Sequence, residues 1–196
     1  MIVYLHGFRS SPRSTKARQL DARLCARGLG AAFRCPQLPV SPREAARVIE
    51  DLVRQLDAQP LAVIGSSLGG YYATWIAERV DCRVVLINPA TQPDRDLVGH
   101  LGTQAVYHSD ATVEIRPEFL DELKALRVGP VTRPDRTLLI AATGDALLDW
   151  REMVARYPDV RQHIVEGSDH GLSDFARYVD EVIDFAIGPN DPRGGR

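Results

Sequence analysis

The chain has 196 residues, of which 44% are hydrophobic and 26% charged, and a formal net charge of −2 at pH 7. This length fits one ordinary domain, and the near-average composition excludes a disordered or fibrous protein. The 24 basic residues are balanced by 26 acidic ones, so no basic field exists to hold a phosphate backbone, and nucleic-acid binding is not expected.

Cysteine usage and the first residues indicate where the protein works. The three cysteines form no CxxC pair, which argues against a disulfide framework and favours the reducing cytoplasm. Met1 is followed by neither a positively charged start nor a cleavable apolar run, so we expect no signal peptide. The longest apolar stretches, such as residues 138–142, suit a strand and not a bilayer. We therefore expect a soluble cytoplasmic protein without a membrane span.

Short apolar runs recur along the chain and predict buried strands. Each is rich in strand-forming residues and bounded by Gly, Pro, Asn or Asp, and a weaker run follows the first. In chain order they are residues 2–5, the weaker 31–35, then 61–64, 84–87, 138–142 and 163–165. Continuous apolar runs are typical of strands covered on both faces, which indicates a parallel sheet with helices on either side.

Helical patterns fill the gaps between these runs. Ser14 and Ser41 are capping residues, and Pro42 and Glu44 complete a capping box after the second of them. Asp149 opens a later helix. The inward stripes of the first two helices and of the last one are Ala17, Leu20 and Leu24, then Ala45, Val48, Ile49, Leu52 and Leu56, and finally Phe175, Val179, Val182, Ile183 and Ala186. Strands that alternate with helices predict right-handed βαβ units.

Two stretches depart from this alternation. Residues 91–135 carry one clear helical pattern, around 117–126, where other strands have short links. A long insertion of this kind is usually a lid or binding element, or else an excursion without structure. Residues 189–196 form a polar tail rich in Gly and Pro, which we expect to be disordered. The chain is thus read as a single domain over 1–188 with a cap inserted at about 91–135.

The sequence Gly65-Ser66-Ser67-Leu68-Gly69 has the form G-x-S-x-G. It follows the run at 61–64 and precedes a helical pattern, which is the strand–turn–helix setting of a nucleophile elbow. Such a tight turn puts Ser67 in a strained conformation, and side chains at Gly65 and Gly69 would collide with it. The alternative is a Gly/Ser turn that binds phosphate or only packs. It is not a P-loop, because no Gly-Lys-Ser/Thr ending is present.

A serine hydroxyl is a poor nucleophile without a base, and the chain order expected here is serine, acid, histidine. His170 lies between the last strand and the last helix, where ligand sites of open α/β sheets gather. The histidines at other positions, for which surface or packing roles are expected, are His100, His108 and His163.

Two carboxylates follow the run at 138–142. Asp145 lies in the strand-end loop, where it can reach the imidazole and fix its tautomer. Asp149 has a structural explanation as the cap of the next helix. We favour Asp145.

An acyl-transfer site also needs donors for a developing oxyanion. One is the amide of Leu68, directly after the nucleophile. The loop after residues 2–5 supplies a second, with the Phe8 amide as the candidate and Gly7 allowing close approach. His6 is either an ordinary residue at a strand end or, as we prefer, a residue that orients this loop.

Several of these segments together resemble the YqiA-like family of small bacterial esterases. They are Tyr4-Leu5-His6-Gly7-Phe8, Ser10-Ser11-Pro12-Arg13-Ser14, Pro36-Gln37-Leu38-Pro39, Gly65 to Trp75, Asn88-Pro89-Ala90, Thr143-Gly144-Asp145 and the loop from Gly167 to His170. The resemblance covers nearly the whole chain, is weakest over 91–135 and does not reach the tail. It departs from many lipases in having one glycine, not three, in the oxyanion loop.

The resemblance implies a minimal α/β-hydrolase fold that starts at the strand usually third in larger members. That fold is a mostly parallel sheet of about six strands with helices on both faces and an inserted cap. It also implies hydrolysis of small acyl esters or thioesters by a triad of Ser67, Asp145 and His170. We expect no metal, because the Asp, His and Glu spacing offers no zinc pattern, and no organic cofactor.

Other activities fit the same residues. An acyltransferase or a peptidase would use the same triad, and a binding or sensing module could keep the fold without chemistry. The apolar residues of the insertion either shape an acyl channel or form an amphipathic helix; they are Leu97, Leu101, Phe119, Leu120, Leu123 and Leu126. Arg9 and Arg13 either meet an anionic leaving group, such as a coenzyme A phosphate, or are exposed and solvated, which we favour.

Overall fold

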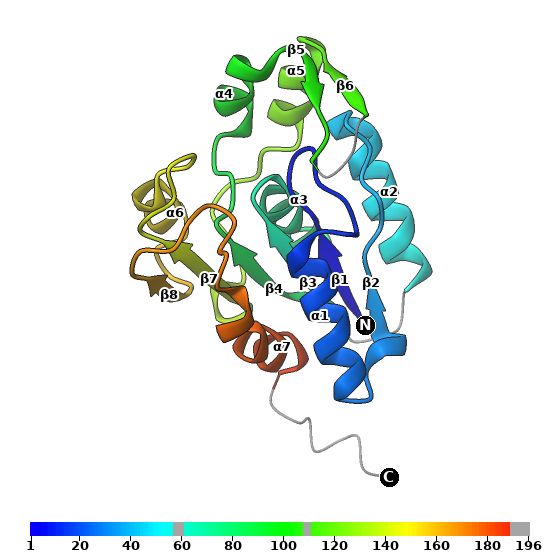
Figure 1. The fold of residues 1–196 in the computed structure, drawn as a ribbon, viewed down its shortest axis with the longest axis vertical. Coiled ribbons are helices and arrows are strands. Elements are labelled where there is room, and N and C mark those ends of the chain that lie inside the picture. Colours follow the sequence, from blue (N-terminus) through cyan, green and yellow to red (C-terminus); the bar gives the residue numbers. More distant parts are fainter. Residues whose placement is uncertain (57–60, 108–110, 189–196) are drawn as a thin grey trace.

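The computed structural model describes residues 1–56, 61–107 and 111–188. A six-stranded sheet in the order β2-β1-β3-β4-β7-β8 forms its centre, and every neighbouring pair in it is parallel (Figure 1). The strands are β1 (Ile2–Leu5), β2 (Phe33–Arg34), β3 (Leu61–Ser66), β4 (Cys82–Ile87), β7 (Thr137–Ala142) and β8 (Arg161–Val165). The predicted disorder of the tail and the predicted role of His108 concern residues outside the described part of the chain.

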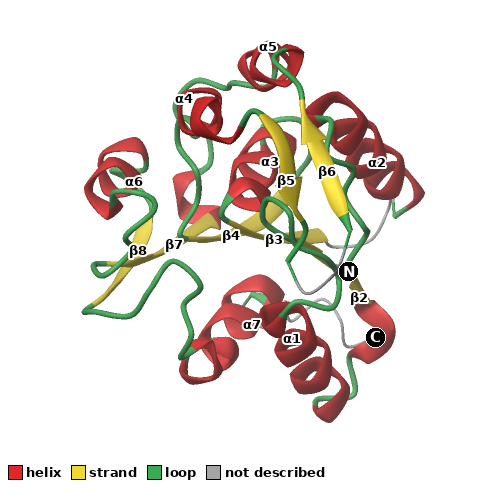
Figure 2. Ribbon diagram, turned by 45° about the horizontal axis from the view of Figure 1, so that its top comes forward, coloured by secondary structure: helices red, strands yellow, loops and turns green. Residues whose placement is uncertain are grey.

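The apolar runs are continuous because helices cover both faces of the sheet. Successive side chains of a strand point to opposite faces, so Val63 of β3 packs in one core and Ala62 and Ile64 in the other. One face carries α1 (Thr15–Ala26) and α7 (Val179–Ile187), as Figure 2 shows. The other carries α2 (Pro42–Gln55), α3 (Leu68–Ala77) and α6 (Trp150–Arg156). This arrangement confirms the predicted parallel sheet between two helical layers.

Three helices begin at the residues that the sequence predicted. The Ser14 hydroxyl accepts from the Ala17 amide at 3.4 Å, and the Ser41 hydroxyl accepts from the Glu44 amide at 3.3 Å. The Asp149 carboxylate accepts from the Arg151 amide at 2.9 Å, as a cap of α6 should.

Two elements are shorter than predicted. The weak strand over 31–35 is a 3₁₀ turn, Gly30–Ala32, followed by the two residues of β2, which pair only with Ile2 and Val3 at the edge of the sheet. The last helix is divided, because Phe175–Arg177 forms a 3₁₀ turn before α7 begins. In both cases the apolar pattern was right and the backbone hydrogen bonding differs locally.

The insertion holds more regular structure than its sequence indicated. It contains α4 (Pro93–Asp96), a 3₁₀ turn (Leu97–His100), an antiparallel ribbon of β5 (Gly102–Ala105) and β6 (Thr112–Ile115), and α5 (Glu118–Ala125). In both ribbon views these elements lie at the end of the molecule where the strands finish, beyond the carboxyl edge of the sheet (Figure 1, Figure 2). No helix among the described residues is long and apolar enough to cross a bilayer.

The strand order has one reversal. From β1 the chain moves outward to β2 and then returns past β1 to β3, so the reversal lies between β1 and β3. In open α/β sheets the crevice at the carboxyl ends of the strands beside such a point is where ligands bind. The loops that leave β1 and β3 carry Gly7 and Ser67.

Candidate active site

Ser67 stands at the turn between β3 and α3 in a conformation that few serines adopt. Its φ is 54° and its ψ is −123°. The turn is held by its neighbours: the Ser67 amide donates to Ile87 at 3.0 Å, and the Ser67 carbonyl accepts from Gly70 at 2.9 Å and from Ala90 at 3.0 Å. A strained residue that is fixed from both sides is typical of a functional site.

The flanking glycines are required by space. A Cβ at Gly65 would lie 2.3 Å from the carbonyl oxygen of Gly69, and a Cβ at Gly69 would lie 2.0 Å from that of Leu5. Both contacts are with backbone that cannot move aside, which confirms the predicted collisions.

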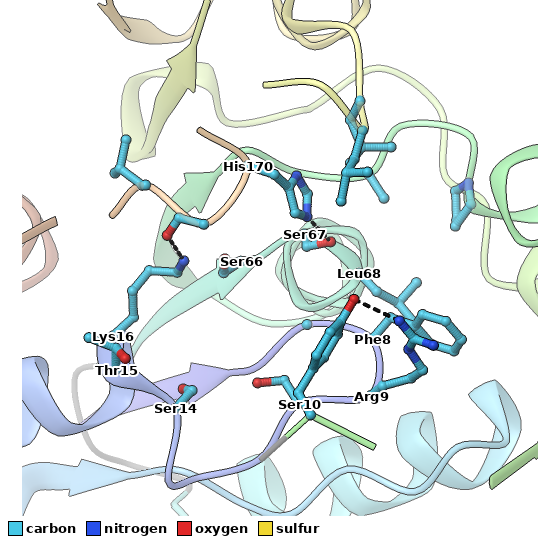
Figure 3. Close-up of a pocket in the computed structure, with 18 of the residues that line it drawn as sticks. Phe8, Arg9, Ser10, Ser14, Thr15, Lys16, Ser66, Ser67, Leu68 and His170 are labelled. Atoms are coloured by element: carbon cyan, nitrogen blue, oxygen red, sulfur yellow. Dashed lines mark hydrogen bonds between the residues drawn. The ribbon is translucent and has the colours of Figure 1, made fainter. Parts of the chain in front are cut away.

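The structure brings Ser67, His170 and Asp145 together in one chain of hydrogen bonds. The Nε2 of His170 lies 3.1 Å from the Oγ of Ser67, and its Nδ1 lies 2.7 Å from the Oδ2 of Asp145. Because a carboxylate can only accept, Nδ1 carries the proton and Nε2 is left to accept from the serine hydroxyl. Figure 3 shows the imidazole of His170 directed at Ser67.

The Asp145 side chain is fully buried in this arrangement, whereas the His170 side chain is 24% exposed. The other carboxylate oxygen of Asp145 accepts from the amides of Leu147 and Leu148, each at 2.9 Å. These bonds fix the direction of the carboxylate toward His170. Asp149, the alternative acid, is occupied as the cap of α6.

His163 and His100 have other surroundings than His170. His163 lies beside Glu181, with its Nδ1 2.6 Å from the carboxylate, and packs edge-on against Tyr178. His100 lies at the wall of the cavity, with its ring 5.7 Å from that of Phe8. The surface or packing role predicted for His163 fits these contacts, whereas His100 is exposed and lines the cavity itself.

Asn88 is a supporting residue that the sequence reasoning did not single out. It is fully buried, and its side-chain amide donates to the carbonyls of Asp169 at 3.1 Å and His170 at 3.0 Å. Its carbonyl oxygen accepts from the Ala142 amide at 2.8 Å. Asn88 therefore connects the ends of β4 and β7 to the loop that carries His170. The only sequence signal was Asn88-Pro89-Ala90, which was used for the family resemblance.

The loop after β1 lies directly against the nucleophile. A Cβ at Gly7 would come within 3.1 Å of the Ser67 Cβ, so only glycine gives this approach without displacement. Phe8 and Leu68, whose amides are the predicted oxyanion donors, line the same cavity as Ser67. Neither amide donates a hydrogen bond within the described part of the chain, so both are available for a ligand.

His6 orients this loop through a defined tautomer. Its Nε2 accepts from the Leu38 amide at 3.1 Å, so its Nδ1 carries the proton and donates to the Gly7 carbonyl at 3.0 Å. Burial lowers the pKa of His6, which keeps the ring neutral. The Gly7 carbonyl and the Phe8 N–H belong to one planar peptide and point in opposite directions. Holding the carbonyl toward His6 therefore turns the Phe8 N–H away from it.

A cavity of about 820 Å³ opens over Ser67 and His170. Leu97 of the insertion lines it, whereas Phe119 and Leu123 of α5 are buried in the core. Of the two alternatives for the apolar residues of the insertion, an acyl channel or an amphipathic helix, α5 therefore follows the second. The described residues contain no cluster of three or more His, Cys, Asp or Glu side chains suited to a metal ion.

The two arginines of the loop behave differently. Arg9 is held by the insertion, since it donates to Gln104 at 2.8 Å and to the Tyr107 hydroxyl at 2.7 Å, and its guanidinium lies 4.6 Å from the Tyr107 ring centre. The Tyr107 amide in turn donates to the Arg9 carbonyl at 3.0 Å. Arg9 is therefore not the solvated residue that we expected, whereas Arg13 is exposed.

Known proteins resemble this chain along almost its whole length. A family model described as an uncharacterised protein family, UPF0227, matches residues 1–187. A UPF0227 protein of Shewanella woodyi is 29% identical over 164 residues, which make up 78% of this chain and 86% of the relative.

Solved structures match in fold. A protein from Agrobacterium vitis S4 has a TM-score of 0.77 at 18% identity and covers 94% of this chain and 87% of its own. Mouse alpha/beta hydrolase domain-containing protein 10 has a TM-score of 0.70 at 15% identity, with coverage of 93% and 89%. Est1E from Butyrivibrio proteoclasticus has a TM-score of 0.69 at 13% identity, with coverage of 93% and 84%. These likenesses confirm the predicted fold class.

Proposed function

The chain belongs to the UPF0227 family, and from that premise we propose that it is a serine hydrolase that cleaves carboxylic esters or acyl thioesters. The observation that carries the proposal is the chain of hydrogen bonds from Ser67 through His170 to Asp145. It lies beneath an open cavity, at the reversal of the strand order. The hydrolase names of several proteins with this fold are consistent with it.

Acylation would proceed from this geometry without rearrangement of the three side chains. The Oγ of Ser67 attacks the carbonyl carbon of the substrate while the Nε2 of His170 takes the hydroxyl proton. The carbonyl oxygen becomes an oxyanion and accepts from the Phe8 and Leu68 amides. The intermediate then collapses, the acyl–oxygen or acyl–sulfur bond breaks, and His170 gives its proton to the leaving group.

Deacylation reverses the roles with water. His170 removes a proton from a water molecule, whose oxygen attacks the acyl-enzyme, and the proton passes to Ser67 as the acid product leaves. Asp145 stays ionised throughout, orients the ring and stabilises the imidazolium. Apart from the substrate and water, every group in these steps is supplied by the chain.

Intact-mass labelling with a fluorophosphonate probe tests the proposal. We expect one probe mass on the wild type and none on Ser67→Ala. Ser11→Ala is the control and should be fully labelled, because the Ser11 hydroxyl of the wild type lies outside the cavity, where it accepts from the Arg13 amide. A folded wild type that takes no label would contradict an activated serine and favour the binding module.

The leaving group and the acceptor are tested next. Comparing kcat/KM for an oxygen ester and the matching thioester of butyrate separates esterase from thioesterase activity. Adding an alcohol or an amine separates hydrolysis from acyl transfer, because a transferase would give the transferred ester or amide faster than free acid. A predominance of that product would replace the hydrolase proposal by the acyltransferase alternative.

A further inference from the structure

The cavity over Ser67 has two chemically different sides. In Figure 3, Phe8 and Leu68 lie on one side of Ser67, and Ser14, Thr15 and Lys16 lie on the other. The first side carries the oxyanion donors and apolar side chains. The second carries hydroxyl groups and the ammonium of Lys16.

Lys16 enters the cavity as a cation without a carboxylate partner. It is the second residue of α1 and half-buried, and within the described residues its Nζ makes one hydrogen bond, to the carbonyl oxygen of Gly171. An ammonium has three donors, so two remain for a ligand. A lysine is seldom drawn into a cavity without a counter-charge, because water solvates it better.

The carboxylates whose charge reaches Lys16 are already engaged. Asp169 accepts from the amide of Ser173 at 2.9 Å and from its hydroxyl at 2.5 Å. Asp145 accepts from His170 and from two backbone amides. Arg9, the other strong base of the cavity lining, is held by Gln104 and Tyr107. Lys16 is therefore the cationic group that this cavity offers to a bound molecule.

The position of Lys16 indicates which part of a substrate it would meet. The leaving group must take its proton from the Nε2 of His170, so it departs on the side of that ring. Lys16 is bonded to Gly171, the residue directly after His170. Phe8 and Leu68, whose amides are the proposed oxyanion donors, lie on the opposite side of Ser67 from Lys16 in Figure 3.

We propose that Lys16 recognises an anionic group, a carboxylate or a phosphate, on the leaving-group portion of the substrate. The inference rests on the proposed hydrolase function and narrows its substrate class to esters or thioesters of anionic alcohols or thiols. Charge-assisted hydrogen bonds from an ammonium to such a group are shorter and stronger than those between neutral groups. Lys16 would thus determine specificity and take no part in proton transfer.

The test compares esters that differ only in charge. The butyrate ester of 4-hydroxyphenylacetate carries a carboxylate, and that of 4-hydroxyphenylacetamide is its neutral counterpart. In the anionic ester a methylene group and the aromatic ring separate the charge from the reacting phenolic oxygen. The butyrate ester of 4-hydroxybenzylphosphonate supplies the phosphate-like form. We expect the wild type to have the higher kcat/KM for at least one anionic ester, and Lys16→Met to lower the anionic-to-neutral ratio about 10-fold.

Lys124→Met is the matched control. Lys124 is the other lysine of the sequence, exposed on α5 and paired with Asp121, and its loss should leave the ratio unchanged. If Lys16 only positions the His170 loop through Gly171, Lys16→Met lowers kcat/KM for both esters by the same factor. An unchanged ratio would therefore overturn the proposal.

A second pair of esters tests whether Lys16 meets the leaving group or the acyl group. Phenyl hemisuccinate carries its charge on the acyl portion, and phenyl butyrate is the neutral counterpart. A Lys16 effect confined to this pair would overturn the assignment to the leaving group. If Lys16→Met does not fold, the wild type suffices: its anionic-to-neutral ratio must exceed one and fall with added salt, because salt screens the attraction. A ratio of one at low salt refutes the inference, while hydrolysis of the neutral ester and probe labelling report separately on the proposed function.

Discussion

The side-chain amide of Asn88 donates a hydrogen bond to the carbonyl oxygen of His170 at 3.0 Å. Through this bond the end of a central strand fixes the loop that carries the proposed base. The same side chain also hydrogen-bonds to Asp169 and Ala142, so the loop of His170 and the end of β7, both distant in sequence from Asn88, depend on it.

Asn88→Ala should impair both stability and turnover. It removes three buried hydrogen bonds, worth together about 3 kcal/mol of unfolding free energy, and releases the His170 loop. Urea unfolding and ester hydrolysis measure the two effects. The control Gln162→Ala, on the edge strand β8, loses one hydrogen bond, to the carbonyl oxygen of Tyr157, and should cost only about 1 kcal/mol with kcat unchanged. Equal losses in the two variants would contradict a special role for Asn88.

Asp145→Asn should abolish most of the turnover without unfolding the protein. The amide no longer favours the Nδ1–H tautomer of His170, and kcat should fall by roughly 10³–10⁴. Asp149→Asn provides the comparison, since asparagine also caps a helix and should leave the rate of ester hydrolysis intact. The reverse pattern would assign the acid to Asp149.

His6 should make part of the stability depend on pH. Burial lowers its pKa in the folded protein, so between the folded value and about 6.5 the unfolded chain binds more protons. The stabilisation is therefore complete above about pH 6.5 and is lost as the pH falls below it. The difference in unfolding free energy between the wild type and His6→Gln should shrink from pH 7.5 to pH 5.5. A difference that grows toward acid would show that the His6 ring is charged in the fold.

The charge preference of the cavity should end in mildly alkaline solution. Burial lowers the pKa of Lys16 to about 8, against the opposing charges of Asp169 and Asp145. The ammonium is the charged form, so an anionic leaving group is favoured at pH 7 and loses its advantage as the pH rises through 8. Any effect of pH on the hydrolysis step itself is common to both esters and cancels in their ratio. A ratio that stays constant from pH 7 to pH 9.5 would contradict this prediction.

The sequence predicted those parts of the site that depend on local chemistry. The turn around Ser67 requires glycine on both sides, which gives the G-x-S-x-G motif. The strand before it is buried on both faces, which gives a continuous apolar run. The helix caps Ser14, Ser41 and Asp149 were readable for the same reason.

The parts that depend on distant contacts were not predictable. The ribbon of β5 and β6 is mostly exposed. β5 lacks an apolar alternation, and that of β6 extends over only four residues, Thr112–Ile115, which is too short to distinguish the ribbon from a loop. Asn88 acts on segments more than 50 residues away. Lys16 follows a helix cap and looks like any surface lysine until α1 is packed beside the loop of His170.

Arg9 adjoins Phe8, whose amide is a proposed oxyanion donor, and its side chain and carbonyl are both bonded to the insertion. Replacing the insertion with that of another relative would consequently remove the contacts that hold the loop of Phe8 and Arg9, together with the part of the cavity wall that the insertion supplies. In the proposed hydrolase, substrate range and rate would then change together, and a graft that brings a new 91–135 segment must also bring a partner for Arg9.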